Sequence, residues 1–167
     1  GAERGGGQHH PWHNSAYDAD GALRPDYMDR LRRVLDEADR LGMAPMLGLF
    51  YFGQDQRLAD ERAVLAAADH VVDWLIAHGY RHVIIEIDNE CDVPRYDHDI
   101  LTPRRVAELV ERVRDRCDGR FPVGVSLAGG NVPGDELISA MNVIMLHGNG
   151  VGDPARIREM VDQTRAS

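Results

Sequence analysis

Three carboxylates alternate along one short segment of the sequence, at Glu86, Asp88 and Glu90. Side chains of a strand point alternately to opposite faces, so we expect these three acids to share a face. Crowded like charges raise the pKa of a carboxyl group, which suits a general acid that works near neutral pH. Burying three acids is unfavourable unless they are paired. The segment is therefore either a functional site or an ion-pair network with arginines such as Arg81 or Arg95, and the pattern alone leaves both interpretations open.

The elements that would position these acids alternate between helical and strand patterns. Apolar spacing predicts helices over 25–41, over 58–78, from Thr102-Pro103 onward, and from Asp153-Pro154 to about Arg165. Apolar runs predict buried strands over 44–52, 82–88, 121–127 and 142–147. Strands joined by helices imply an α/β fold with a parallel sheet and right-handed crossovers. The alternation fits a partial (β/α)8 barrel and also a doubly wound open sheet.

Polar residues gather directly after the predicted strands. The four groups are Gly53-Gln54-Asp55, Asn89-Glu90, Gly129-Gly130-Asn131 and His147-Gly148-Asn149. Loops at the carboxyl ends of parallel strands converge on one edge of the sheet, which is where α/β folds place their sites. We therefore expect a cleft at this edge.

Composition and missing motifs exclude several classes of function. The chain has 167 residues, of which 43% are apolar and 28% charged, as in one globular domain. Its net charge of −9 disfavours a nucleic-acid partner, and the absence of Lys excludes a P-loop. Ser126 has no nucleophile elbow around it, and neither His nor Cys shows metal-ligand spacing. No apolar run is long enough to span a membrane and no signal peptide opens the sequence, so the compartment stays undetermined.

The octapeptide Val83-Ile84-Ile85-Glu86-Ile87-Asp88-Asn89-Glu90 resembles the strand-four signature of retaining glycoside hydrolases with (β/α)8 barrels, especially the cellulase-like family five. In that signature a hydrophobic triplet, a Glu, an aliphatic residue and any residue precede Asn-Glu. The resemblance implies that Glu90 is the catalytic acid/base and that Asn89 binds the sugar 2-hydroxyl. The sequence departs from the signature at Cys91, where the family usually has Pro.

Other segments follow the same resemblance in order and spacing. The predicted strands over 44–52, 121–127 and 142–147 resemble strands three, five and six of the barrel. Residues 1–24 would form the active-site loop region after strand two, and 25–167 a single domain of barrel units from helix two to helix six. The resemblance implies a set of substrate-binding residues besides Asn89, namely Trp12, Tyr51, Gln54, His147 and Asn149.

The resemblance also implies a reaction, the cleavage of O-glycosidic bonds of a glycoside or polysaccharide by retaining double displacement. It implies neither a metal nor an organic cofactor. Such a mechanism needs two carboxyl groups about 5 Å apart. The clan's nucleophile, a Glu at the end of strand seven, is expected beyond Ser167, because a barrel takes about 250 residues. The complete protein is then a glycosidase, and the chain alone is expected to be inactive.

Two other hypotheses remain open from the sequence. One is a non-catalytic carbohydrate-binding relative of the barrel that lacks the nucleophile. The other is a self-contained doubly wound domain, for which 167 residues is an ordinary size. The sequence specifies neither the sugar, the linkage, the endo or exo mode of action, nor the oligomeric state.

Overall fold

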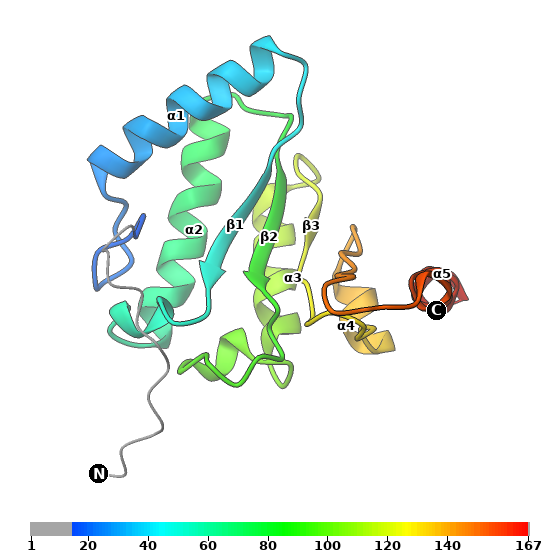
Figure 1. Ribbon diagram of the computed structural model, residues 1–167. Coiled ribbons are helices and arrows are strands. Elements are labelled where there is room, and N and C mark those ends of the chain that lie inside the picture. Colours follow the sequence, from blue (N-terminus) through cyan, green and yellow to red (C-terminus); the bar gives the residue numbers. More distant parts are fainter. Residues whose placement is uncertain (1–14, 167) are drawn as a thin grey trace, which may run out of the picture.

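The computed structural model describes residues 15–166, which form an open three-stranded parallel sheet with flanking helices (Figure 1). The strands are β1 (Met46–Tyr51), β2 (Ile84–Asn89) and β3 (Val123–Gly124). The α-helices are α1 (Pro25–Arg40), α2 (Glu61–Ala77), α3 (Val106–Cys117), α4 (Asp135–Ala140) and α5 (Pro154–Ala166), and two 3-10 turns are η1 (Asp55–Arg57) and η2 (Asp99–Leu101). The predicted α/β class is confirmed.

Strands that follow one another in the chain are neighbours in the sheet. β1 pairs with β2 and β2 with β3, both in parallel, so that Glu86 lies opposite Gly48 on one side and Gly124 on the other. A doubly wound sheet reverses its strand order at a switch point. The described strands keep the order β1-β2-β3 without reversal, which is the order of strands in part of a barrel.

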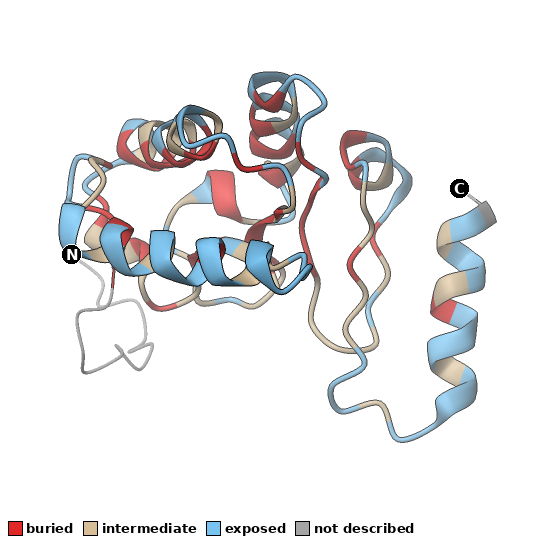
Figure 2. Ribbon diagram, turned by 90° about the horizontal axis from the view of Figure 1, so that it is seen from above, coloured by how far each residue is buried: buried red, intermediate tan, exposed pale blue. Residues whose placement is uncertain are grey.

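The core lies between the sheet and the helices α2 and α3. Ile85 and Ile87 of the central strand β2 are fully buried, as are Val64 and Leu75 of α2 and Leu109 of α3. The apolar faces predicted for α2 and α3 are therefore the faces that form the core, whereas Val34 and Leu41 from the apolar face predicted for the first helix are exposed. Figure 2 shows that burial is concentrated in these elements, whereas α1 and α5 present long exposed faces. No helix within residues 15–166 is long and apolar enough to cross a membrane.

The third helix begins later than the sequence predicts. Thr102 does not open it; instead Thr102 follows η2 and its Oγ donates to the Asp99 carbonyl oxygen at 2.8 Å. The helix α3 starts at Val106, after a turn over 103–105. A serine or threonine hydroxyl can serve either a helix start or a local turn, and here the local turn prevails.

The predicted strands over 121–127 and 142–147 are mostly wrong. Only Val123–Gly124 forms a strand, and the second segment contributes one isolated parallel bridge, between Ser126 and Met145. The two segments nevertheless lie side by side, since Asn142 N–H donates to the Val123 carbonyl oxygen at 3.1 Å.

In a parallel ladder the backbone N–H groups of one segment would donate to backbone carbonyl oxygens of the other. Here two of these N–H groups donate to side chains instead. The Val123 N–H donates to Asn142 Oδ1 at 2.5 Å, and the Val125 N–H donates to Met141 Sδ at 3.3 Å. Each backbone N–H provides one hydrogen for bonding. The apolar pattern therefore predicted the burial of most of 121–127 correctly, whereas in 142–147 only Met145 is buried and the predicted pairing is wrong.

Candidate active site

Glu90 follows β2 directly and has an unusual backbone. Its φ is +54°, in the left-handed region that residues other than glycine seldom adopt. Two hydrogen bonds to Ser126 hold the turn: the Glu90 N–H donates to Ser126 Oγ at 2.9 Å, and the Cys91 N–H donates to the Ser126 carbonyl oxygen at 3.0 Å. The end of β2 is thereby fixed to the segment that follows β3.

The carboxylate of Glu90 meets two side chains from the segment after the Met145 bridge. Asn149 Nδ2 donates to Glu90 Oε1 at 2.7 Å, and His147 Nδ1 lies 3.0 Å from the same oxygen. A carboxylate only accepts, so the 3.0 Å contact is a hydrogen bond in which His147 carries the proton on Nδ1. The Glu90 side chain is 13% exposed, which leaves its carboxylate at the surface of the site.

These contacts overturn the expected direction of the Glu90 pKa. Crowding among acids predicts a raised pKa, but the hydrogen bonds from Asn149 and His147 lower the pKa of Glu90 below its ordinary 4.5. They outweigh burial and the repulsion from Asp92, both of which act in the opposite direction. Donors that point at the charged form stabilise it. Glu90 is therefore a carboxylate at neutral pH in this structure.

Glu86 lies on the other side of His147. Its Oε1 accepts a hydrogen bond from Ser126 Oγ at 2.6 Å and lies 4.0 Å from His147 Nε2. The imidazole ring of His147 thus stands between two carboxylates, Glu86 and Glu90. The side chains of Glu86 and Glu90 are similarly buried, 10% and 13% exposed.

Asp88 is the acid whose pKa crowding does raise. It is fully buried, and neither of its carboxylate oxygens has a hydrogen-bond partner within the described part of the chain. Desolvation, followed by the charges of Glu86, Asp55 and Asp92, raises its pKa well above the ordinary value. Because Asp88 is enclosed it cannot reach a substrate, so of the three acids Glu86 and Glu90 remain open to chemistry.

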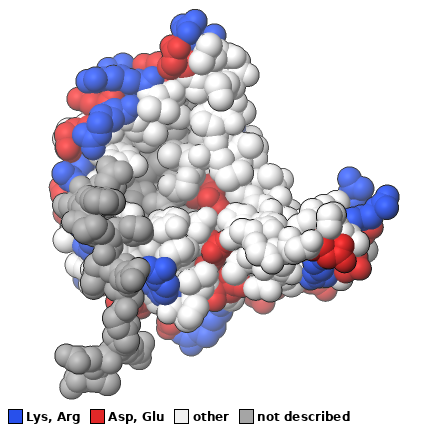
Figure 3. Space-filling view, viewed as in Figure 1, with Lys and Arg blue, Asp and Glu red and all other residues white. Residues whose placement is uncertain are grey.

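An open hollow of about 580 Å³ lies in front of Glu90. It is lined by Tyr51, Phe52, Asn89, Glu90, Leu146, His147, Gly148 and Asn149. Tyr51 is 40% exposed, and its ring centroid lies 4.2 Å from that of Phe52. Figure 3 shows a small group of acidic side chains in the middle of a mostly uncharged face. A carboxylate beside an exposed aromatic ring can bind a ligand that offers both hydroxyl groups and an apolar face, as a sugar does.

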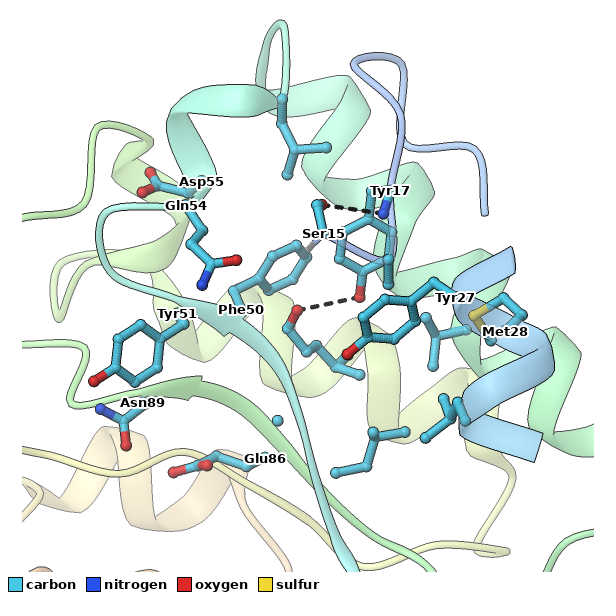
Figure 4. A pocket seen from close by; sticks show the side chains of 17 residues that line it. Ser15, Tyr17, Tyr27, Met28, Phe50, Tyr51, Gln54, Asp55, Glu86 and Asn89 are labelled. Carbon is cyan, nitrogen blue, oxygen red and sulfur yellow. Dashed lines mark hydrogen bonds between the residues drawn. The ribbon is translucent and has the colours of Figure 1, made fainter. Parts of the chain in front are cut away.

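A second cavity, of about 290 Å³, adjoins this hollow and shares Tyr51 and Asn89 with it. Figure 4 shows Tyr51 and Asn89 side by side at one end, with Glu86 below them and Gln54 above. The opposite end is formed by aromatic and aliphatic side chains from β1, from α1 and from the segment before α1. The Tyr17 hydroxyl closes this end by donating to the Leu49 carbonyl oxygen at 3.2 Å.

The loop after β2 is tied to the loop after β3 by Asp92. Its two oxygens accept from the Ala128 N–H at 2.7 Å and from Asn131 Nδ2 at 2.6 Å. The loop after β3 is tied in turn to the His147 segment, because the Gly130 N–H donates to the His147 carbonyl oxygen at 3.0 Å. Three loops from different parts of the sequence therefore hold the surroundings of Glu90 as one unit.

The structure brings most of the predicted binding residues together. Asn89, Tyr51, His147 and Asn149 share the hollow with Glu90, and Gln54 lines the adjoining cavity instead. Trp12 lies outside the described residues.

Sequence reasoning missed Ser126 and Asp92, which contact or support this site. One signal was available for Ser126: it is a polar residue inside the apolar run 121–127. Within residues 15–166, no group of three or more His, Cys, Asp or Glu is arranged to hold a metal ion.

Comparison with known proteins supports the fold. No protein-family model and no curated protein matches the sequence. Among solved structures, the chain is similar to a GH5-4 broad specificity endoglucanase from an uncultured bovine rumen ciliate, with a TM-score of 0.52 and 16% identity. The match covers 80% of this chain but 39% of the endoglucanase, so the chain spans less than half of that protein's length. The described residues thus have the fold of part of a (β/α)8 barrel of the kind found in a glycoside hydrolase.

Proposed function

We propose that this chain is the part of a retaining glycoside hydrolase that carries the acid/base residue, Glu90. One observation carries the proposal: a hydrogen-bonded carboxylate at the carboxyl end of a barrel-type strand opens into a hollow beside the exposed ring of Tyr51. Active sites of (β/α)8 barrels lie at this end of the strands. The similarity to an endoglucanase supports the same fold and leaves the reaction to experiment.

In the proposed reaction Glu90 acts twice. It first donates a proton to the glycosidic oxygen as the bond to the anomeric carbon breaks, and it later removes a proton from the water that releases the sugar. The ionised Glu90 of this structure is in the state for the second step. A second carboxylate about 5 Å away would raise its pKa by like-charge repulsion and prepare the first step.

We place the nucleophile of this proposal outside the 167 residues. Glu86, which shares His147 with Glu90, is a poor candidate because it lines the smaller cavity instead of the hollow in front of Glu90, and its Oε1 already accepts the Ser126 hydroxyl. The side chain of Asn89 lines both hollows, where we propose that it binds the sugar 2-hydroxyl. Tyr51 would stack on a sugar ring, since an exposed aromatic face suits the apolar face of a sugar.

The proposal is tested by Glu90→Gln in the complete polypeptide that contains this chain. The amide keeps the shape but cannot transfer the proton, so kcat for an unactivated glycoside should fall about 10²–10⁴-fold, the usual contribution of general acid–base catalysis. Glu136→Gln, at an exposed position on α4, is the matched control and should leave kcat unchanged. Unchanged turnover in Glu90→Gln would exclude Glu90 as the acid/base.

A second candidate is a carbohydrate-binding protein without turnover. It is favoured by the two donors that hold Glu90 as a carboxylate, because a fixed acceptor suits hydrogen bonds to sugar hydroxyls. This candidate predicts sugar-induced shifts of the Asn89 and Asn149 side-chain amide signals in NMR spectra, with no product formed by the complete polypeptide. Product formation that depends on Glu90 would exclude it.

A further inference from the structure

Ser126 is completely buried, yet it makes three hydrogen bonds around the end of β2. Its Oγ accepts from the Glu90 N–H at 2.9 Å and donates to Glu86 Oε1 at 2.6 Å, while its carbonyl oxygen accepts from the Cys91 N–H at 3.0 Å. One residue of the β3 segment therefore contacts Glu86, Glu90 and Cys91 of the β2 segment.

The direction of the hydroxyl hydrogen follows from its partners. An amide N–H can only donate, so it needs a lone pair of the hydroxyl oxygen, whereas a carboxyl oxygen can accept the hydroxyl hydrogen. The Ser126 O–H must therefore point at Glu86, and its lone pairs are left for the Glu90 N–H. Glu86 orients the hydroxyl, and the hydroxyl in turn holds the backbone of Glu90.

Glu90 needs such a restraint because its φ of +54° is unfavourable for a residue with a Cβ. Strained backbone of this kind persists only where the surroundings fix it. Two successive amides, those of Glu90 and Cys91, are both fixed by Ser126. A proline at position 91 has no N–H and could not make the second bond.

We propose that Ser126 is a positioning residue, which holds the left-handed turn at Glu90 and so aims the Glu90 carboxylate at His147 and Asn149. The segment with these two partners is joined to Ser126 as well, through the parallel bridge to Met145. Ser126 thus contacts both the backbone of Glu90 and the segment that carries its partners His147 and Asn149. The consequence for catalysis rests on the function proposed for Glu90, whereas the structural role does not.

Amide hydrogen exchange of the 167-residue chain tests the structural role without any need for activity. Ser126→Ala removes the acceptor of the Glu90 N–H and keeps the carbonyl that accepts from Cys91. Exchange at Glu90 should become about five- to tenfold faster, as expected for the loss of one hydrogen bond, while exchange at Cys91 changes less than about twofold. Ser139→Ala, whose hydroxyl bonds within the exposed helix α4, is the control and should alter neither amide.

Equal exchange at Glu90 in Ser126→Ala and in the unaltered chain would overturn the proposal, and so would equal acceleration at Glu90 and Cys91. Should the alanine variant not fold, Ser126→Cys carries the same test with a weaker acceptor of similar shape, and faster exchange at Glu90 than at Cys91 is again required. In an active form of the protein, Ser126→Ala should lower kcat about 10-fold with KM within about twofold, because a misaimed acid/base weakens the transition state alone. Failure of Glu90→Gln to affect turnover would refute the proposed function and leave the exchange result intact.

Discussion

A substitution at Gly129 should separate Glu90 from Asn149, its shorter hydrogen-bond partner, while both of these residues stay unchanged. A Cβ at this position would stand 1.8 Å from the Asn149 carbonyl oxygen and 2.8 Å from its carbonyl carbon. A real Cβ keeps at least 3.0 Å, so Gly129→Ala must part the two segments by the difference, about 1.2 Å. Both atoms in contact belong to the backbone, and a rotamer change cannot relieve the clash.

We expect this shift of the Asn149 backbone to lengthen the contact between Asn149 and Glu90. A displacement of about 1.2 Å directed away from Glu90 would take the Nδ2 to Oε1 distance from 2.7 Å to about 3.9 Å, beyond hydrogen-bond reach. This bond is the main cause of the lowered pKa of Glu90, so the pKa should rise toward the ordinary 4.5. A lowered pKa stabilises the fold above pH 4.5 and loses that contribution as the pH falls through the folded value. In Gly129→Ala this contribution shrinks, and overpacking should lower the free energy of unfolding by about 1–3 kcal/mol.

The assay is a titration of the Glu90 side-chain carboxyl carbon by NMR, with urea unfolding at neutral pH alongside. Gly152→Ala is the matched control, because its Cβ would meet nothing within 4 Å. The control should titrate like the unaltered chain. A folded Gly129→Ala with an unchanged Glu90 pKa would refute the reasoning, since it would show that Asn149 does not hold the Glu90 charge.

Three further predictions concern stability. Burial and the neighbouring acids raise the pKa of Asp88, so this group makes the fold less stable as the pH rises from 3.8 toward its folded pKa. Asp88→Asn removes this titration and should flatten the decline of the urea midpoint above pH 3.8; an unchanged slope would contradict this. The hydrogen bond to Asp55 raises the pKa of His98, so the protonated His98 stabilises the fold at low pH and less so as the pH rises. Thermal unfolding should therefore show that His98→Asn loses more stability at pH 6 than at pH 8. The same loss at both pH values would exclude a stabilising contact between protonated His98 and Asp55. Ile87 is fully buried, so Ile87→Ala should lower the free energy of urea unfolding by about 2–4 kcal/mol. Val34 is 61% exposed, and Val34→Ala should lower it by less than about 0.5 kcal/mol. Similar losses in the two variants would contradict the assigned core.

The sequence determined the elements whose residues make local or repetitive contacts. The helices α1, α2 and α5 and the strands β1 and β2 lie where apolar spacing predicts them. A helical face repeats every three or four residues and a buried strand is a short apolar run, so the information lies within the element itself. Asn89 and Glu90 were found in the same way, from their place after a buried strand.

Tertiary structure decided what depends on partners far away in the sequence. The apolar run over 142–147 predicts a strand, but Met141 and Asn142 use their side chains to occupy the N–H groups of Val125 and Val123. No pattern within the run records this competition. A bridge thus takes the place of a ladder.

The charge of Glu90 most clearly separates what the sequence determines from what the tertiary structure decides. The alternation of Glu86, Asp88 and Glu90 is written in the sequence, and it predicts one crowded carboxyl group with a raised pKa. Folding raises the pKa of Asp88, which is buried with no hydrogen-bond partner among residues 15–166. It lowers the pKa of Glu90, because two donors from 57 and 59 residues away contact that carboxylate. Residue spacing determined where the acids stand, whereas desolvation and hydrogen bonds between distant segments decided which of them is charged, because both arise only when the loops meet.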